Sequence, residues 1–252
     1  MNFTHIHSSS RYDRSLESLE RAAKKYNADA DLITYTEVEF EPREKAVKKA
    51  NGKEFGFVSG DESHANDSVI SYRKDRFKLV YSENFKNSDI VVYRVDGEAR
   101  DLPYSTIAVF DDLKTGKRFV VSVAHYASDV QSELGNKGTT YRRVLQWRQS
   151  VSRTKRRVNK LAKQYKCDAR LMVADWNADF KLAWVRALVK SMAPTYLNTW
   201  KQLDVKGGTH GNRIIDATLT RGDLGVKKPG AELYEDDASS DHRPYIEILV
   251  WL

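Results

Sequence analysis

Six strand-like segments follow one another through the middle of the chain, and this run limits the folds open to its 252 residues. Asp111, Asp112, Thr115 and Gly116 predict a hairpin turn between the last two segments. Further strands are expected near both ends of the chain. The predicted strands cover residues 3–7, 32–38, 55–58, 68–73, 77–81, 90–94, 104–110, 118–124, 171–174, 214–220 and 245–251.

Only a few helical patterns interrupt these strands. One begins after Asp13 or Ser15, either of which would cap it, and runs to Tyr26. A longer one starts near Thr140, and a third covers residues 182–192 before a proline. Adjacent strands with few helices predict an α/β fold, a two-sheet β-sandwich flanked by helices in four layers, α/β/β/α. No Pro/Gly/Ser linker divides the chain, so we expect a single domain over residues 1–252.

Composition removes several classes of protein. Apolar residues make up 40% of the chain and charged residues 31%, a balance that supports a buried core. The single cysteine, Cys167, excludes a disulfide-stapled secreted domain and a thiolate zinc cluster. We find no secretory signal and no apolar run long enough to span a bilayer, and therefore expect a cytoplasmic monomer with no membrane partner. The net charge of +7 suits a polyanionic partner.

Acidic, amide and imidazole side chains stand where the predicted strands end. Such positions are brought together when strands assemble into a sheet. Carboxylates there suit Mg²⁺ or Mn²⁺, and an imidazole beside a carboxylate can stabilise charge on a phosphate. Taken singly, each residue also fits an ordinary role as a solvated side chain, a turn or a satisfied core histidine. These residues are His5, His7, Glu37, His125, Asp175, Asn177, Asp241 and His242, and Asp216 joins them from inside the predicted strand 214–220.

Six short motifs place these residues in a recognisable order. The motifs THIH, LITYTEV, VVSVAHYASD, LMVADWNAD, GNRIIDATL and SSDHRPY run from His5 to the C-terminal strand. In this order the chain resembles the endonuclease/exonuclease/phosphatase family, which includes pancreatic deoxyribonuclease, abasic-site endonucleases, sphingomyelinases and inositol polyphosphate phosphatases. The resemblance covers nearly the whole chain and implies one endonuclease/exonuclease/phosphatase-like domain.

The resemblance also implies a role for each residue. Glu37 would bind a divalent metal, Mg²⁺ or Mn²⁺, and Asp241 would be a second, partly metal-linked aspartate. Asp175 and Asn177 would contact the attacking water and the phosphate. His242 would be held against the scissile phosphate, oriented and charged by Asp216, with His125 as another active-site histidine. Asn66 corresponds loosely to a further polar residue of the cleft.

One departure from the family concerns the metal. His5 stands where the family has asparagine, and His7 is the second choice for that position. An imidazole nitrogen would favour Mn²⁺ over Mg²⁺. We weigh this ligand role for His5 equally against a hydrogen bond to Glu37 or to a bound water.

These features predict a divalent-metal-dependent phosphodiesterase that hydrolyses nucleic acid, DNA in preference to RNA. Basic residues from Arg142 to Lys166 and the segments 126–141 and 195–200 are candidates for contacts with the substrate. One alternative is a phosphatase or phosphodiesterase acting on a small or lipid-linked phosphoester. A second is a non-catalytic nucleic-acid binding protein. The sequence leaves open which group removes the proton and whether cleavage is endo- or exonucleolytic.

Overall fold

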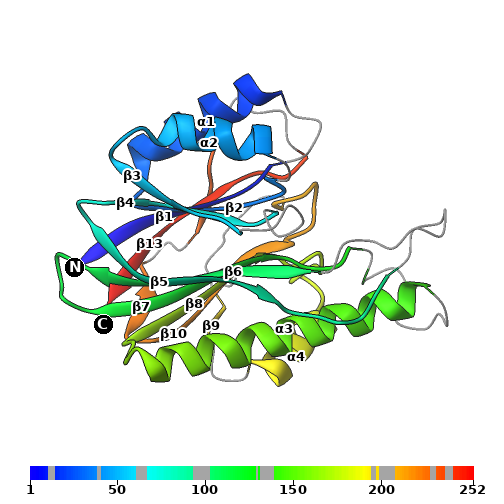
Figure 1. Cartoon of the computed structure of the whole chain (residues 1–252). Helices are drawn as coiled ribbons and strands as arrows, with labels where there is room; N and C mark the ends of the chain where they lie inside the picture. The colour runs from blue at the N-terminus through cyan, green and yellow to red at the C-terminus, as the bar shows by residue number, and fades with distance from the viewer. Residues whose placement is uncertain are drawn as a thin grey trace.

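Two β-sheets lie face to face, with helices on both outer sides (Figure 1). The computed structural model describes residues 1–10, 15–38, 41–60, 67–92, 103–128, 130, 139–193, 197–198, 208–227, 231–235 and 241–252. Helices α1 (Leu16–Asp29) and α2 (Glu41–Asn51) cover one sheet, and α3 (Thr139–Gln164) and α4 (Ala183–Met192) cover the other. The predicted four-layer sandwich is confirmed. Among the described helices, we find none with the length and apolar character of a membrane span.

Each sheet combines one parallel pair of strands with antiparallel neighbours. The parallel pairs are β1 with β2 and β7 with β8, and α1 and α3 make the two crossover connections that such pairs require. The first sheet has the order β11 (Leu224–Val226), β13 (Tyr245–Trp251), β1 (Asn2–Ser9), β2 (Leu32–Thr36), β4 (Val69–Arg73) and β3 (Phe55–Val58), with β12 (Glu232–Leu233) also on β13. The second has the order β5 (Phe77–Lys86), β6 (Tyr104–Asp112), β7 (Arg118–His125), β8 (Ala169–Asp175), β10 (Asp216–Gly222) and β9 (Leu197–Asn198).

The hairpin and the first helix formed as expected. The turn between β6 and β7 closes through Gly116 N–H, which donates to the Asp112 carbonyl at 2.8 Å, and the φ of +70° at Gly116 suits glycine. Helix α1 is capped by Ser15, whose hydroxyl accepts from Ser18 N–H at 3.2 Å.

The strand predicted over residues 90–94 is wrong in its described part. Residues 90–92 pair with no strand among the described residues, and side chains of α3 donate to the carbonyls of two of them. Gln146 donates to the Ile90 carbonyl at 2.8 Å and Arg142 to the Val91 carbonyl at 3.3 Å. Residues 93 and 94 lie outside the described part. Helix α2 was not predicted, because Glu and Lys outnumber apolar residues in it and leave only a narrow buried face.

Alternation along the strands divides the space between the sheets into two halves. Side chains that share one face of β1 begin with Phe3 in the apolar core and continue with His5 and His7. In the same way, the face of β8 that begins with Leu171 in the apolar core ends with the carboxylate of Asp175. One end of the inter-sheet space is therefore an apolar core and the other end is polar. The apolar half contains Phe3, Leu32, Ile70, Phe77, Phe110, Phe119, Val121, Leu171, Val173, Leu249 and Trp251.

Candidate active site

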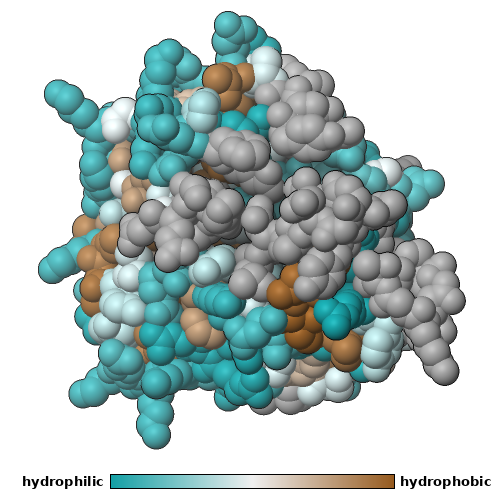
Figure 2. Space-filling model, turned by 45° about the vertical axis from the view of Figure 1, so that its right-hand side comes forward, coloured by the Kyte–Doolittle hydropathy of each residue, from teal (hydrophilic) through white to brown (hydrophobic). Residues whose placement is uncertain are grey.

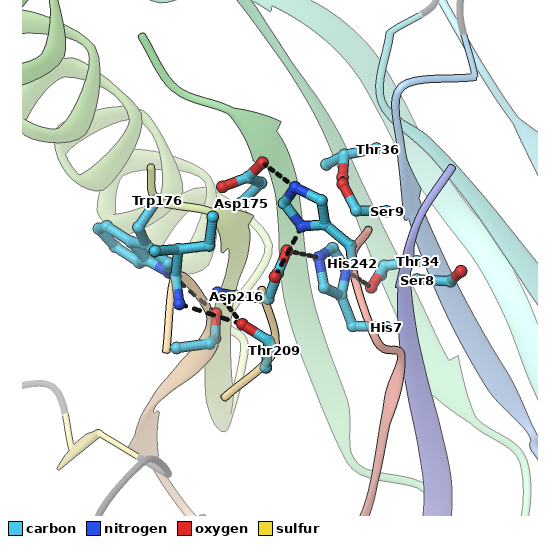
Figure 3. A network of polar contacts seen from close by, with 12 residues as sticks. His7, Ser8, Ser9, Thr34, Thr36, Asp175, Trp176, Thr209, Asp216 and His242 are labelled. Carbon is cyan, nitrogen blue, oxygen red and sulfur yellow. Dashed lines mark hydrogen bonds and ion pairs between the residues drawn. The ribbon is translucent and has the colours of Figure 1, made fainter. Parts of the chain in front are cut away.

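The polar end of the inter-sheet space brings together the strand-end residues. His125 and Asp175 end the parallel neighbours β7 and β8 and are paired in register. Asp216 begins β10 directly opposite Asp175. Figure 3 shows Asp175, Asp216 and His242 pointing toward one another, with His7 entering from the first sheet. The pairing of the strands thus brings His125, Asp175 and Asp216, which are far apart in the sequence, together at the same end of the inter-sheet space.

His242 and Asp216 form the buried centre of the site. His242 Nδ1 lies 3.0 Å from Asp216 Oδ2, and His242 Nε2 lies 3.8 Å from Asp175 Oδ2. Burial alone would lower the pKa of His242, but the Asp216 and Asp175 carboxylates raise it to about 10. Burial would raise the pKa of Asp216, yet the neighbouring His242 and His7 rings lower it. The pair is therefore an imidazolium–carboxylate pair at neutral pH.

Asp175 has the opposite electrostatic environment. Burial and the nearby Asp216 carboxylate raise the pKa of Asp175 to about 7. Its Oδ1 accepts from Asn177 N–H at 2.8 Å, whereas its buried Oδ2 has no hydrogen-bond partner among the described residues. A buried oxygen of this kind is costly unless a substrate, water or ion completes it. Asp175 can therefore receive a proton near neutral pH.

Glu37, His125 and Asp67 line the more open side of the site. His125 Nδ1 lies 2.9 Å from Asp67 Oδ2, and its Nε2 lies 3.9 Å from Glu37 Oε1 and 3.6 Å from Asp175 Oδ2. Burial opposes a charge on His125, but Asp67, Asp175 and Glu37 raise its pKa well above the usual value. Burial also raises the pKa of Glu37. Three carboxylates, those of Glu37, Asp67 and Asp175, therefore surround the imidazole of His125 in this corner.

Backbone strain is also concentrated here. Of the three described non-glycine residues with positive φ, two are Glu37 at 59° and Asn177 at 48°. Such conformations cost free energy and persist where the surroundings hold them. Asp67 Oδ1 accepts from Glu37 N–H at 3.0 Å, and Asn177 Nδ2 donates to the Tyr126 carbonyl at 2.9 Å. The backbone of Glu37 and the side chain of Asn177 are thus held by specific bonds at the ends of their strands.

The connections before β10 and before β13 together supply the outermost part of the site. Asp241 Oδ2 lies 3.0 Å from His210 Nε2, and His210 packs edge-on against His242 with ring centroids 4.7 Å apart. Arg213 Nη2 lies 2.6 Å from His210 Nδ1. The Thr209 hydroxyl accepts from Asp216 N–H at 3.1 Å and so fixes the start of β10. Asp241 lies beside the site, on its solvent side.

The donor set fits a hard divalent cation. One oxygen each from Glu37 and Asp175 and one nitrogen of His125 lie within 4.8 Å of one another. Two carboxylates and an imidazole suit Mg²⁺ or Mn²⁺, and the unpartnered Asp175 Oδ2 is an oxygen that such a cation would satisfy. Two further groups, Asp175–Asp216–His242 and His210–Asp241–His242, also have one oxygen or nitrogen of each residue within 4.8 Å of the others. The histidine raised as a ligand from the sequence, His5, belongs to none of these described groups.

The structure places His5 deeper than the sequence analysis expected. Its two ring nitrogens face Glu247 Oε1 at 2.7 Å and Thr34 Oγ1 at 3.0 Å, so neither is directed to Glu37. His5 pairs in register with Leu32, five positions before Glu37, and the side chain is fully buried. These contacts give no support to the metal-ligand role considered for His5. The imidazole of β1 that reaches the site is that of His7.

Several site residues had little signal in the sequence. Asp67, Thr209 and His210 come from connections without periodicity, and only the neighbouring Asn66 was considered. Asn66 lies outside the described residues, as do most of the segments 126–141 and 195–200.

Comparison with solved structures identifies the fold. An endonuclease/exonuclease/phosphatase family protein from Bacteroides thetaiotaomicron matches with a TM-score of 0.74 and 16% identity, over 100% of this chain and 98% of that one. A mannosyl-6-phosphatase from the same organism matches at 0.72 and 16%, over 98% and 99%. D. rerio TDP2 complexed with single strand DNA product matches at 0.67 and 15%, over 99% of each chain. No protein-family model and no curated protein matches the sequence. The chain has the fold of the endonuclease/exonuclease/phosphatase family.

Proposed function

We propose that this chain is a divalent-metal-dependent phosphoester hydrolase whose substrate is a phosphodiester of nucleic acid, DNA in preference to RNA. One observation carries the proposal. The buried imidazolium of His242, the unpartnered oxygen of Asp175 and the Glu37–His125 corner meet at the end of the inter-sheet space. Together they would supply an acid, a base and a metal site within reach of one phosphate.

The proton chemistry follows from the carboxylate of Asp175 and the imidazolium of His242. Asp175, whose pKa is about 7, would take a proton from the attacking water as the water oxygen bonds to phosphorus. His242, whose pKa is about 10, is already protonated and would place its positive charge against the phosphate oxygens. Asn177 would orient the water or a phosphate oxygen. The ester P–O bond then breaks, the leaving oxygen takes up a proton from the His242 imidazolium, and the proton held by Asp175 returns to His242.

The metal site completes this arrangement. Glu37 would hold the ion, with His125 and Asp175 beside it and Asp241 at the solvent side. When bound, the ion would polarise the phosphate and stabilise the leaving oxygen. Asp67 would hold His125 in place through its 2.9 Å contact with Nδ1.

The charge of α3 supports a nucleic-acid substrate. This helix contains nine Lys and Arg residues and no Asp or Glu. Arg153 and Arg157 pair with Asp89 and Glu83, but Arg148, Arg156 and Lys160 are exposed and have no ion-pair partner among the described residues. Much of the described surface in Figure 2 is hydrophilic. Exposed cations with no carboxylates between them suit a phosphate backbone.

A small phosphoester is the second candidate. The specific observation is the mannosyl-6-phosphatase, whose fold matches this chain over almost its full length. Such a substrate would need the metal and His242 but not the cations of α3.

A substrate panel tests the proposal. Purified protein with Mg²⁺ or Mn²⁺ would be given plasmid, linear DNA, DNA with an abasic site, RNA, bis(4-nitrophenyl) phosphate and mannose 6-phosphate. We expect metal-dependent cleavage of DNA, abolished by EDTA and lowered about 10²-fold or more in His242→Ala. Turnover of mannose 6-phosphate alone would favour the second candidate. Binding of DNA without turnover of any substrate would favour the non-catalytic alternative.

A further inference from the structure

A line of buried polar side chains leads from the C-terminal strand to the site. Glu247 Oε1 on β13 lies 2.7 Å from His5 Nδ1, and His5 Nε2 lies 3.0 Å from Thr34 Oγ1. The same hydroxyl lies 2.9 Å from His7 Nδ1, and His7 Nε2 lies 3.5 Å from Asp216 Oδ1. Figure 3 shows its site end, where Thr34 and His7 approach Asp216 from the first sheet.

These residues are unusual for a protein interior. Glu247, His5, Thr34, His7 and Asp216 are each at most 1% exposed. Buried polar groups of this kind would be replaced at little cost by apolar residues if they only filled space. The next residues on the same faces, Leu249 and Phe3, are apolar. The line of polar side chains therefore begins at the boundary between the apolar half and the polar half of the inter-sheet space.

The direction of hydrogen bonding follows from Asp216. Its two oxygens lie between two imidazoles, Oδ2 at 3.0 Å from His242 Nδ1 and Oδ1 at 3.5 Å from His7 Nε2, and a carboxylate only accepts, so His7 must present Nε2–H to it. Burial lowers the pKa of His7, and a neutral ring that carries its proton on Nε2 accepts at Nδ1. The Thr34 hydroxyl then donates its one hydrogen to His7 Nδ1. His5 Nε2–H must in turn donate to Thr34 Oγ1, because that oxygen has no second hydrogen to give, and the 2.7 Å contact of His5 Nδ1 with Glu247 Oε1 needs a further proton between those two atoms.

Three atoms of this line have no hydrogen-bond partner among the described residues: Glu247 Oε2, His7 Nε2 and Asp216 Oδ1. The last two face each other at 3.5 Å. Contacts in active sites often tighten only when substrate is bound. Asp216 is thus held on one side by His242 and steered on the other by His7.

We propose that Glu247, His5, Thr34 and His7 form a buried hydrogen-bond chain that positions Asp216, and through it His242, for phosphoester hydrolysis. The proposal rests on the proposed function and adds four positioning residues to it. They touch neither substrate nor metal. This hydrogen-bond chain joins the two sheets, because β13, β1 and β2 belong to the first sheet and β10 belongs to the second.

The key link is the hydroxyl of Thr34, because a single substitution removes it with little change of shape. Thr34→Val deletes the donor to His7, and Thr34→Ser keeps it. The matched control is Thr218→Val, since Thr218 is equally buried and its hydroxyl lies 2.8 Å from the Tyr245 hydroxyl, outside the chain. Melting temperatures show whether each variant is folded at the assay temperature.

The activity assay uses bis(4-nitrophenyl) phosphate with Mn²⁺. We expect Thr34→Val to lower kcat about tenfold with KM within about twofold, because positioning acts on the transition state. Thr34→Ser and Thr218→Val should each retain kcat within about twofold. In a protein that already carries Asp216→Asn, Thr34→Val should lower kcat no further, since the chain acts through that carboxylate. A full tenfold loss in that background, or equal losses in Thr34→Val and Thr218→Val, would overturn the proposal.

A spectroscopic readout is independent of activity. Long-range ¹H–¹⁵N spectra of imidazole-labelled protein report which ring nitrogen carries the proton. We expect a neutral His7 with its proton on Nε2. A proton on Nδ1 of a neutral His7 would reverse the donor order and overturn the chain. If no phosphoester is hydrolysed but this tautomer is found, the proposed function fails while the hydrogen-bond chain stands.

A second pair of variants covers the case in which Thr34→Val does not fold. His7→Gln retains an amide N–H toward Asp216 and an oxygen that can accept from Thr34, whereas His7→Leu retains neither. We expect His7→Gln to keep kcat within about threefold and His7→Leu to lose about tenfold or more, again without a matching change in KM. Equal losses in both variants would contradict a positioning role for His7.

Discussion

Replacing Asp216 with asparagine removes the charge that keeps His242 protonated. In the intact protein the pKa of His242 is about 10, so the ring is a cation throughout the neutral range. Asparagine at 216 keeps the shape but loses the 3.0 Å ion pair. Burial of the ring would then lower its pKa and Asp175 at 3.8 Å would raise it, which returns it towards the ordinary value of about 6.5.

The expected size of the effect follows from these values. A group whose pKa is about 6.5 is charged in only about one molecule in ten at pH 7.5 and in about nine of ten at pH 5.5. A cation is lost as pH rises through its pKa, so Asp216→Asn should lose activity on the alkaline side first. We expect kcat to fall about tenfold at pH 7.5 relative to the intact protein and to recover most of that loss at pH 5.5.

The assay is the ratio of kcat in Asp216→Asn to kcat in the intact protein, measured with bis(4-nitrophenyl) phosphate at pH 5.5 to 8.5. The ratio cancels ionisations that Asp216 does not influence; that of Asp175 is not one of them, because the Asp216 carboxylate raises its pKa. An NMR titration of the His242 ring in both proteins gives its pKa directly. A ratio that does not change with pH, together with an unchanged pKa of His242, would refute the reasoning.

Three further results are expected. Glu37→Gln should raise the Mn²⁺ concentration for half-maximal activity about tenfold or more, and a titration that matches the intact protein would remove Glu37 from the metal site. Arg76→Met should destabilise the fold by about 3–5 kcal/mol in urea unfolding, because it leaves the buried Asp112 carboxylate, 2.8 Å away, without its cation. An unchanged midpoint would contradict that value. Arg156→Glu with Lys160→Glu should weaken DNA binding and reduce its salt dependence while leaving bis(4-nitrophenyl) phosphate turnover unchanged, and equal salt slopes would exclude α3 from the DNA contact.

The sequence predicted the centre of the site because strands place their end residues predictably. Asp175 and His125 follow apolar strands, and parallel pairing of β7 with β8 aligns them. The four layers followed from the number of adjacent strands and the few helices between them. The same rules predicted the described part of the strand 90–94, residues 90–92, wrongly, because Gln146 and Arg142 of α3 donate to the carbonyls of Ile90 and Val91.

The choice between His5 and His7 could not be made from spacing. Both lie on the same face of β1, because they are two residues apart. Which of them reaches the site depends on how far β1 extends past Leu32 of β2 and on the partner that β13 offers, here Glu247 opposite His5. Asp67 and His210 were missed for a related reason, since they arrive through connections that carry no periodic signal.

The central claim is that Asp175 and its neighbours hydrolyse a phosphoester with a bound metal. The most direct measurement is single-turnover hydrolysis of bis(4-nitrophenyl) phosphate in Mn²⁺ by the intact protein, Asp175→Asn and the control Asp223→Asn, whose side chain is exposed beside Lys117 at the other end of β10. We expect Asp175→Asn to be about 10²-fold slower or more, and Asp223→Asn to match the intact protein. A folded Asp175→Asn protein that hydrolyses the substrate at the intact rate would contradict the claim.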